Sequence, residues 1–186
     1  DDPAKIQAFD SDEFSEEFKQ GIRKDDLILK QLVKQWNNIN SYDPKYNTFV
    51  EKLKTEFLND DDNKTKKLVV FSESKETTAY LMGRLKSDGF TRILSVDSSN
   101  SKDLTEVIAE NFDANHPITE TKNDYDIVIT TEVLAEGVNL HRSNTIVNYD
   151  IPWNATRLMQ RIGRVNRVGT SAKFIHIYNF FPTEQA

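Results

Sequence analysis

Apolar side chains in the first third of the chain recur with the period of a helix. One stripe at i, i+4 and i+8 covers residues 14–22, and a second apolar face covers residues 29–39. Gly21 and the charged residues 24–26 lie between these two stripes. Because an amphipathic helix repeats its apolar positions every three or four residues, the pattern predicts two helical segments with an interruption between them.

A stronger amphipathic helix is predicted to start at Asp43 and Pro44. Asp is a favoured N-cap, and Pro suits the first helical position because its missing N–H has no partner there. The apolar residues that follow recur at helical spacing, and they are Tyr46, Phe49, Val50, Leu53 and Phe57. An acidic loop, residues 59–63, comes next. We therefore expect residues 1–63 to form a helical N-terminal extension or connector.

From Lys67 onward, short apolar runs alternate with helical patterns. The runs read as buried strands, and they cover residues 68–71, 93–96, 126–130, 145–149 and 174–178. Helical patterns lie between them, at residues 75–86, 104–112, 131–136 and 154–166. This alternation predicts an α/β fold over residues 64–186, with a parallel sheet and helices on both faces.

In such sheets, ligands bind beyond the carboxyl ends of the strands. That rule directs attention to residues 72–74, residues 130–132 and the loop after Tyr149.

Composition narrows the classes of protein that fit. The net charge is −6, and residues 1–62 hold 15 of the 30 acidic residues but only 9 of the 24 basic ones. Residues 151–183 carry five basic residues and no acidic one, which favours a local site for one anion over a broad polyanion surface. The chain has no cysteine and its three histidines lack ligand spacing, so we expect no metal site.

The sequence also predicts where the protein is located and how this chain relates to a longer one. It contains neither a signal peptide nor an apolar run of the ~18 residues that span a membrane, and a cytoplasmic location is the default. The first residue is Asp1 rather than Met, which indicates a fragment of a longer protein.

The densest candidate for chemistry is the arginine-rich run from Gln160 to Gly169. Arg157, Arg161 and Arg164 are spaced at i, i+4 and i+7, and Arg167 follows three residues later. Like charges at this spacing destabilise a helix, and no acidic residue lies nearby in the sequence to offset them. Arginine grips phosphate through a planar fork of donors and stays charged. A solvated basic face paired with distant carboxylates is the alternative for such a cluster.

The spacing Gln-Arg-x-Gly-Arg-x-x-Arg resembles motif VI of superfamily-two helicases and translocases. Residues 129–140, Ile-Thr-Thr-Glu-Val-Leu-Ala-Glu-Gly-Val-Asn-Leu, look like motif V of that superfamily, and residues 69–72 look like motif IV. Order and spacing are similar to those of a RecA-like second lobe over about residues 64–182. The stretch 149–154, Tyr-Asp-Ile-Pro-Trp-Asn, is especially similar to Swi/Snf-type ATPases of the bacterial branch.

The resemblance assigns roles to individual residues at a nucleotide. It implies that Arg164 and Arg167 are arginine fingers, which reach the γ-phosphate of a nucleotide bound mainly by another lobe. Such arginines offset the charge that develops on the transferred phosphoryl group and raise the rate of hydrolysis by roughly 10³–10⁵-fold in related NTPases. Gln160 matches a polar contact near the same phosphate. Gly137 and Asn139 match positions on the ribose side. ATP with Mg²⁺ is the implied cofactor, held mainly by a partner N-terminal lobe.

The resemblance also implies contacts with nucleic acid. Thr131 matches a hydroxyl that holds a backbone phosphate, and Ser72 is assigned the same role. The Swi/Snf similarity implies duplex DNA as the partner, by analogy of family alone. In contrast to many relatives, the helix predicted at residues 104–112 carries Glu106 and Glu110 where a Gln- or Arg-marked helix touches nucleic acid.

Simpler structural roles remain open for several of these residues. Thr131 is equally suited to a helix N-cap, Gly137 to a helix C-cap, and Asn139 to capping the following turn. An aromatic side chain after a proline favours core packing for Trp153. Phe180 and Phe181 are expected to pack at a sheet edge.

The sequence has no Gly-x-x-x-x-Gly-Lys-Ser/Thr phosphate loop and no strand that ends in Asp-Glu. We therefore expect the C-terminal motor lobe of an ATP-dependent helicase or DNA translocase, inactive without its partner lobe. Two other interpretations are a degenerate RecA-like module that binds protein or nucleic acid without an ATP cycle, and a nucleotide-independent α/β regulatory domain.

Overall fold

A computed structural model describes residues 9–39, 43–59, 61–135 and 138–181 of the chain. The chain divides into two compact units, Asp1–Pro44 and Lys45–Ala186. Each unit has its own architecture.

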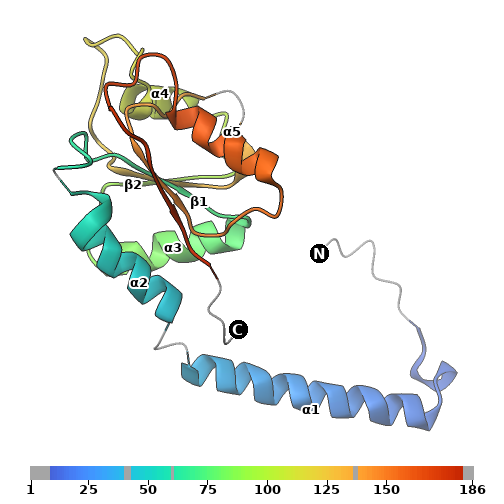
Figure 1. Ribbon diagram of the computed structural model, residues 1–186. Coiled ribbons are helices and arrows are strands. Elements are labelled where there is room, and N and C mark those ends of the chain that lie inside the picture. The colour runs from blue at the N-terminus through green and yellow to red at the C-terminus, as the bar shows by residue number, and fades with distance from the viewer. Residues whose placement is uncertain (1–8, 40–42, 60, 136–137, 182–186) are drawn as a thin grey trace. The chain divides into compact units, whose positions relative to one another are not determined.

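The first unit contains a short 3₁₀ turn, η2 (Ser11–Glu13), and one long helix, α1 (Glu16–Ile39). The predicted interruption at Gly21 and residues 24–26 is wrong, because α1 runs through both without a break (Figure 1). One glycine costs an exposed helix only about 1 kcal/mol. Ion pairs one turn apart, Lys19–Glu16 at 2.9 Å and Lys30–Asp26 at 2.6 Å, favour the helix on either side.

The second unit is built on one parallel sheet of five strands. The strands are β1 (Leu68–Phe71), β2 (Ile93–Val96), β3 (Ile127–Thr130), β4 (Thr145–Asn148) and β5 (His176–Asn179). Their order is β2-β3-β1-β4-β5, and every neighbouring pair is parallel. The central strand β1 lies in register with both neighbours, so its last residue, Phe71, is opposite Thr130 of β3 and Asn148 of β4.

Helices cover both faces of this sheet, as the sequence predicts. They are α2 (Pro44–Lys52), the π-helical turn η3 (Leu53–Phe57), α3 (Lys75–Ser87), α4 (Thr105–Phe112), the 3₁₀ turn η4 (Glu132–Ala135) and α5 (Ala155–Val165). Figure 1 shows α2 and α3 against one face, and α4 and α5 against the other. Ser74 is the N-cap of α3, because its hydroxyl accepts the N–H of Thr77 at 3.1 Å.

The side chains of β1 alternate between two hydrophobic clusters. Leu68 and Val70 pack with α2 and α3, whereas Val69 and Phe71 pack with the α4 and α5 side. The apolar stripe of α2 and η3 is fully part of the first cluster, with Phe49 and Phe57 buried. Residues 45–57 therefore pack as part of the sheet-containing unit.

Two aromatic predictions are wrong. Trp153 lies fully exposed in the loop after β4, although an aromatic residue after a proline is expected in the core. Phe180 packs against Phe49 and Tyr149, as expected at a sheet edge, but the next residue, Phe181, is largely exposed. No helix in the described part of the chain is long and apolar enough to cross a membrane.

Candidate nucleotide and nucleic-acid site

The carboxyl ends of β1, β3 and β4 lie side by side and lead directly into the segments selected from the sequence. Ser72 follows β1, Thr131 follows β3, and Asp150 comes shortly after β4. The chain then turns into α5, whose N-cap Asn154 accepts the N–H of Thr156 at 2.8 Å. This turn places the arginine-rich helix across the sheet face beside the three strand ends.

Arg161, on α5, is fully buried and organises this region. Its guanidinium donates to Glu132 (Nε to Oε1, 2.7 Å), to the Asn148 side chain at 3.0 Å and to the Asp150 carbonyl at 2.9 Å. A further nitrogen, Nη2, donates to carboxylate oxygens of both Glu73 and Glu132. The guanidinium carbon of Arg161, Cζ, also lies over Phe71, 5.1 Å from its ring centre. One side chain thus ties α5 to the ends of β1, β3 and β4.

Distant carboxylates relieve part of the charge conflict that the sequence predicts on α5. Glu73 lies 88 residues before Arg161, and Glu132 lies 29 residues before it. Arg157, one turn earlier, is exposed and 3.6 Å from the other oxygen of Glu73. The sequence signalled that these arginines needed partners, but the partners could be identified only once the sheet was in place.

Asp150 forms a second, partly buried connection at the same strand ends. Its Oδ2 accepts the Ser72 hydroxyl at 2.6 Å, and its Oδ1 accepts Lys45 Nζ at 2.7 Å. Burial raises the pKa of Asp150, but the hydrogen bonds from Lys45 and Ser72 outweigh it, so the pKa is lowered overall. Asp150 is therefore an anion that holds the end of β1 beside the end of β4.

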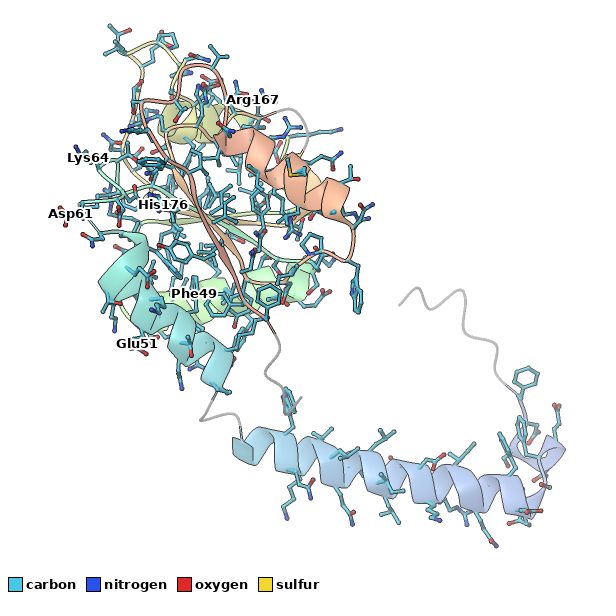
Figure 2. The ribbon with its side chains drawn as sticks, viewed as in Figure 1. Phe49, Glu51, Asp61, Lys64, Arg167 and His176 are labelled. Carbon is cyan, nitrogen blue, oxygen red and sulfur yellow. The ribbon has the colours of Figure 1, made fainter. Side chains whose placement is uncertain are left out.

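Arg167, just beyond α5, is exposed but held in place. Its Nε donates to the Gly163 carbonyl at 3.1 Å, and its Nη1 donates to the Asn139 side-chain oxygen. The Asn139 amide nitrogen in turn donates to Asp113 at 3.0 Å. Figure 2 shows Arg167 near the C-terminal end of α5, on the opposite side of the sheet from Phe49. The structure therefore brings together Arg167 and Asn139, both predicted site residues.

The other residues predicted to contact the nucleotide are Gln160, Arg164 and Gly137. Gln160 is exposed on α5, and Arg164 is partly buried one turn later. The carbonyl of Arg164 accepts the N–H of Leu140 at 2.9 Å, which joins the segment after Asn139 to the same helix. Gly137 lies outside the described residues.

Thr131 and Ser72 differ in their access to a nucleic acid. Thr131 is partly exposed between β3 and η4. Ser72 is fully buried, and its hydroxyl is committed to Asp150. A phosphate contact by Ser72 would therefore require that bond to open.

Sequence reasoning missed Arg161 as the anchor of the site and Asp113 as a partner of Asn139. The conflict among the arginines was a signal for the first, but nothing in the local pattern singled out Asp113. Among the described residues, no group of three His, Asp or Glu side chains is arranged to hold a metal ion.

Comparison with protein families matches this chain, over residues 47–169, to the helicase conserved C-terminal domain. An uncharacterized ATP-dependent helicase, YqhH, from Bacillus subtilis is 32% identical over 113 residues, which is 61% of this chain and 18% of that protein. The ATP-dependent RNA helicase DBP2 from Candida glabrata is 24% identical over 95% of this chain and 30% of its own length. The chain thus spans less than a third of either relative.

Solved structures share the fold. The C-terminal part of the Fun30 ATPase domain matches with a TM-score of 0.59 and 19% identity, covering 99% of this chain and 58% of that one. The C-terminal domain of the DEAD-box protein Dbp5 matches with a TM-score of 0.52 and 22% identity, over 75% of this chain and 71% of that one. These matches establish a RecA-like fold.

Proposed function

Because the chain belongs to the helicase conserved C-terminal domain family, we propose that it is the second motor lobe of an ATP-dependent helicase or DNA translocase. ATP with Mg²⁺ would be held mainly by the N-terminal lobe of the same protein. This lobe would contribute arginine fingers and contacts to the nucleic-acid backbone, and would not hydrolyse ATP alone.

The observation that carries the proposal is the contrast among the arginines of one short segment. Arg161 is buried among carboxylates, whereas Arg167 is exposed and hydrogen-bonded through its side chain to Asn139. The buried anchor fixes the helix, and the exposed guanidinium of Arg167 is accessible to an anion from outside the lobe. That division suits a helix that delivers positive charge to a phosphate held elsewhere.

We assign Arg164 and Arg167 to the γ-phosphate, and Gln160 to a polar contact beside it. Asn139, with Gly137, would line the ribose side of the nucleotide. The bond between Asn139 and Arg167 supports this grouping, because it joins a proposed ribose-side residue to a proposed finger.

We assign the nucleic-acid contact to Thr131, which has exposed surface at the end of β3. Ser72 would join it only in a conformation that releases Asp150. Duplex DNA is our proposed partner, on the similarity of residues 149–154 to Swi/Snf-type ATPases. A phosphate contact of this kind positions the backbone without reading sequence.

Residues 1–63 would connect this lobe to its partner lobe. The packing of α2 and η3 into the sheet-containing unit supports a firm attachment at one end of such a connector. The Lys45–Asp150 ion pair at 2.7 Å adds a link from the start of α2 to the loop after β4.

The test is steady-state ATP hydrolysis by the complete two-lobed protein carrying Arg164→Ala or Arg167→Ala. Each substitution should lower kcat by roughly 10³-fold, because it removes charge from the transition state, while DNA affinity stays within about twofold. Arg157→Ala is the matched control on the same helix and should leave kcat nearly unchanged. Normal turnover in both finger variants would overturn the proposal. Stimulation of turnover by single-stranded RNA, and not by duplex DNA, would reassign the substrate.

A further inference from the structure

Asp113 ends helix α4, outside the segments that match helicase motifs, yet its side chain leads to Arg167. Oδ1 of Asp113 accepts the backbone N–H of Asn115 at 2.8 Å, and Oδ2 accepts the Asn139 amide at 3.0 Å. Its own N–H donates to the Ala109 carbonyl at 3.1 Å. The turn at the end of α4 therefore fixes the backbone and Oδ1 of Asp113, and Oδ2 is left to bind Asn139.

An asparagine side chain has one accepting end and one donating end, which makes its orientation decisive. Because the Asp113 carboxylate can only accept, it requires the Asn139 nitrogen to face it. The Asn139 oxygen must then point the other way, where it accepts from Arg167. Asp113 thus determines which end of Asn139 is presented to the guanidinium.

Packing behind Asp113 supports this arrangement. His141 is buried, with Nδ1 3.6 Å from Oδ1 of Asp113. A Cβ built on Gly169, two residues after Arg167, would lie 2.6 Å from Oδ1 of Asn115 and 3.2 Å from Nε2 of His141. The chain after Arg167 therefore passes close against the same turn that holds Asp113.

We propose that Asp113 is a positioning residue for the arginine finger, acting through the relay formed by Asp113, Asn139 and Arg167. This inference rests on the proposed function of Arg167. A free arginine side chain samples many rotamers, and holding it against Asn139 and Gly163 reduces the ordering required when the nucleotide is bound. Preorganised donors of this kind stabilise developing charge most effectively.

Replacing one carboxylate oxygen of Asp113 by an NH₂ group tests the relay. Asp113→Asn keeps the oxygen that accepts from Asn115 but places an NH₂ group opposite the Asn139 NH₂ group. Asn139 must then turn around and offer a donor to Arg167, which breaks the bond. The double exchange Asp113→Asn with Asn139→Asp restores an acceptor opposite every donor, and position 139 again accepts from Arg167.

The first readout does not depend on ATP turnover. In ¹⁵N NMR of this chain, the wild-type Arg167 guanidinium should show slow rotation and protected protons. Asp113→Asn should abolish both signs, the double variant should restore them, and Asp103→Asn, an exposed control just before α4, should change neither. A mobile wild-type guanidinium, or one unaffected by Asp113→Asn, would overturn the relay. If the single variant does not fold, a mobile Arg167 in the double variant would overturn it equally.

The second readout is ATP hydrolysis by the complete two-lobed protein. Asp113→Asn should lower kcat about tenfold and leave KM for ATP within about twofold, since the finger is misplaced rather than removed. The double variant should recover most of that loss. If Arg167→Ala is inactive but Asp113→Asn has normal kcat, the positioning role is wrong while the finger assignment stands. If Arg167→Ala is itself fully active, the finger assignment of Arg167 fails, and the positioning role of Asp113 fails with it.

Discussion

Arg161 and Arg167 belong to one short segment but occupy opposite environments. Arg161 is buried against Glu73 and Glu132, whereas Arg167 is exposed beside Asn139. Sequence spacing predicts the cluster, and the family resemblance assigns Arg164 and Arg167 to phosphate. The structural role of Arg161 depends on carboxylates 29 and 88 residues away, so it could not be predicted from the sequence around Arg161.

Removal of the buried arginine should therefore be costly to the fold. Arg161→Met should lower the free energy of unfolding by ~3 kcal/mol, because it removes the buried cation that binds both Glu73 and Glu132. Urea denaturation measures this change. Arg157→Met, at the exposed position one turn away, should change it by less than ~0.5 kcal/mol. Equal effects of the two substitutions would contradict the anchoring role.

Lys67 provides a pH-dependent test at the amino-terminal end of β1. Its side chain is buried, donates to the Tyr125 carbonyl and lies 5.0 Å from the ring centre of Phe112. Burial, with Arg142 adding to it, lowers the pKa of Lys67 to about 8.

The unfolded chain keeps the Lys67 proton up to a pH of about 10.4, whereas the folded chain releases it at about pH 8. The unfolded state thus binds more protons between these values, and the contribution of Lys67 to stability rises as pH increases through that window. Thermal unfolding measures the gain in stability between about pH 7.5 and pH 10, and this gain should be smaller for Lys67→Met than for wild type. An identical pH profile for both proteins would rule out the shift.

At the level of elements, strands are predicted better than breaks and turns. All five apolar runs form strands of one parallel sheet, because buried strands have a distinctive continuous pattern. The predicted break in α1 is wrong, since a single glycine does not outweigh a long run of helix-forming residues. The predicted burial of Trp153 is also wrong, because burial of one aromatic side chain depends on what packs over it, and local sequence does not specify that.

Two glycines near the site should respond oppositely to the same substitution. Gly163 lies inside α5, and a methyl group added there would meet no atom within 4 Å, so Gly163→Ala should stabilise the fold by ~0.5–1 kcal/mol. Gly169 has a φ of +105° and its Cβ would lie 2.6 Å from Asn115, so Gly169→Ala should destabilise it by ~1–3 kcal/mol. Chemical denaturation of the two variants measures both, and the same sign for both would contradict these environments.

At the scale of the whole molecule, this lobe is proposed to supply one side of a nucleotide site. Its strand ends are held together by Arg161 and Asp150, and the proposed phosphate-directed residues belong to α5 and to the segment after it. The resemblance of two segments to motifs V and VI predicts that the nucleotide site is shared between two lobes. The hydrogen bonds that position Arg167 required the three-dimensional arrangement, because Asn139 is 26 residues from Asp113 and 28 residues from Arg167 in sequence.

The most direct measurement is a structure of the complete two-lobed protein with Mg²⁺, ADP and aluminium fluoride, which imitates the phosphoryl group in transfer. We expect guanidinium nitrogens of Arg164 and Arg167 to lie about 2.7–3.1 Å from the fluoride group, with Arg161 still bound to Glu73 and Glu132. If the cleft closes on the nucleotide while both arginines remain bound only to groups of their own lobe, the central claim is wrong.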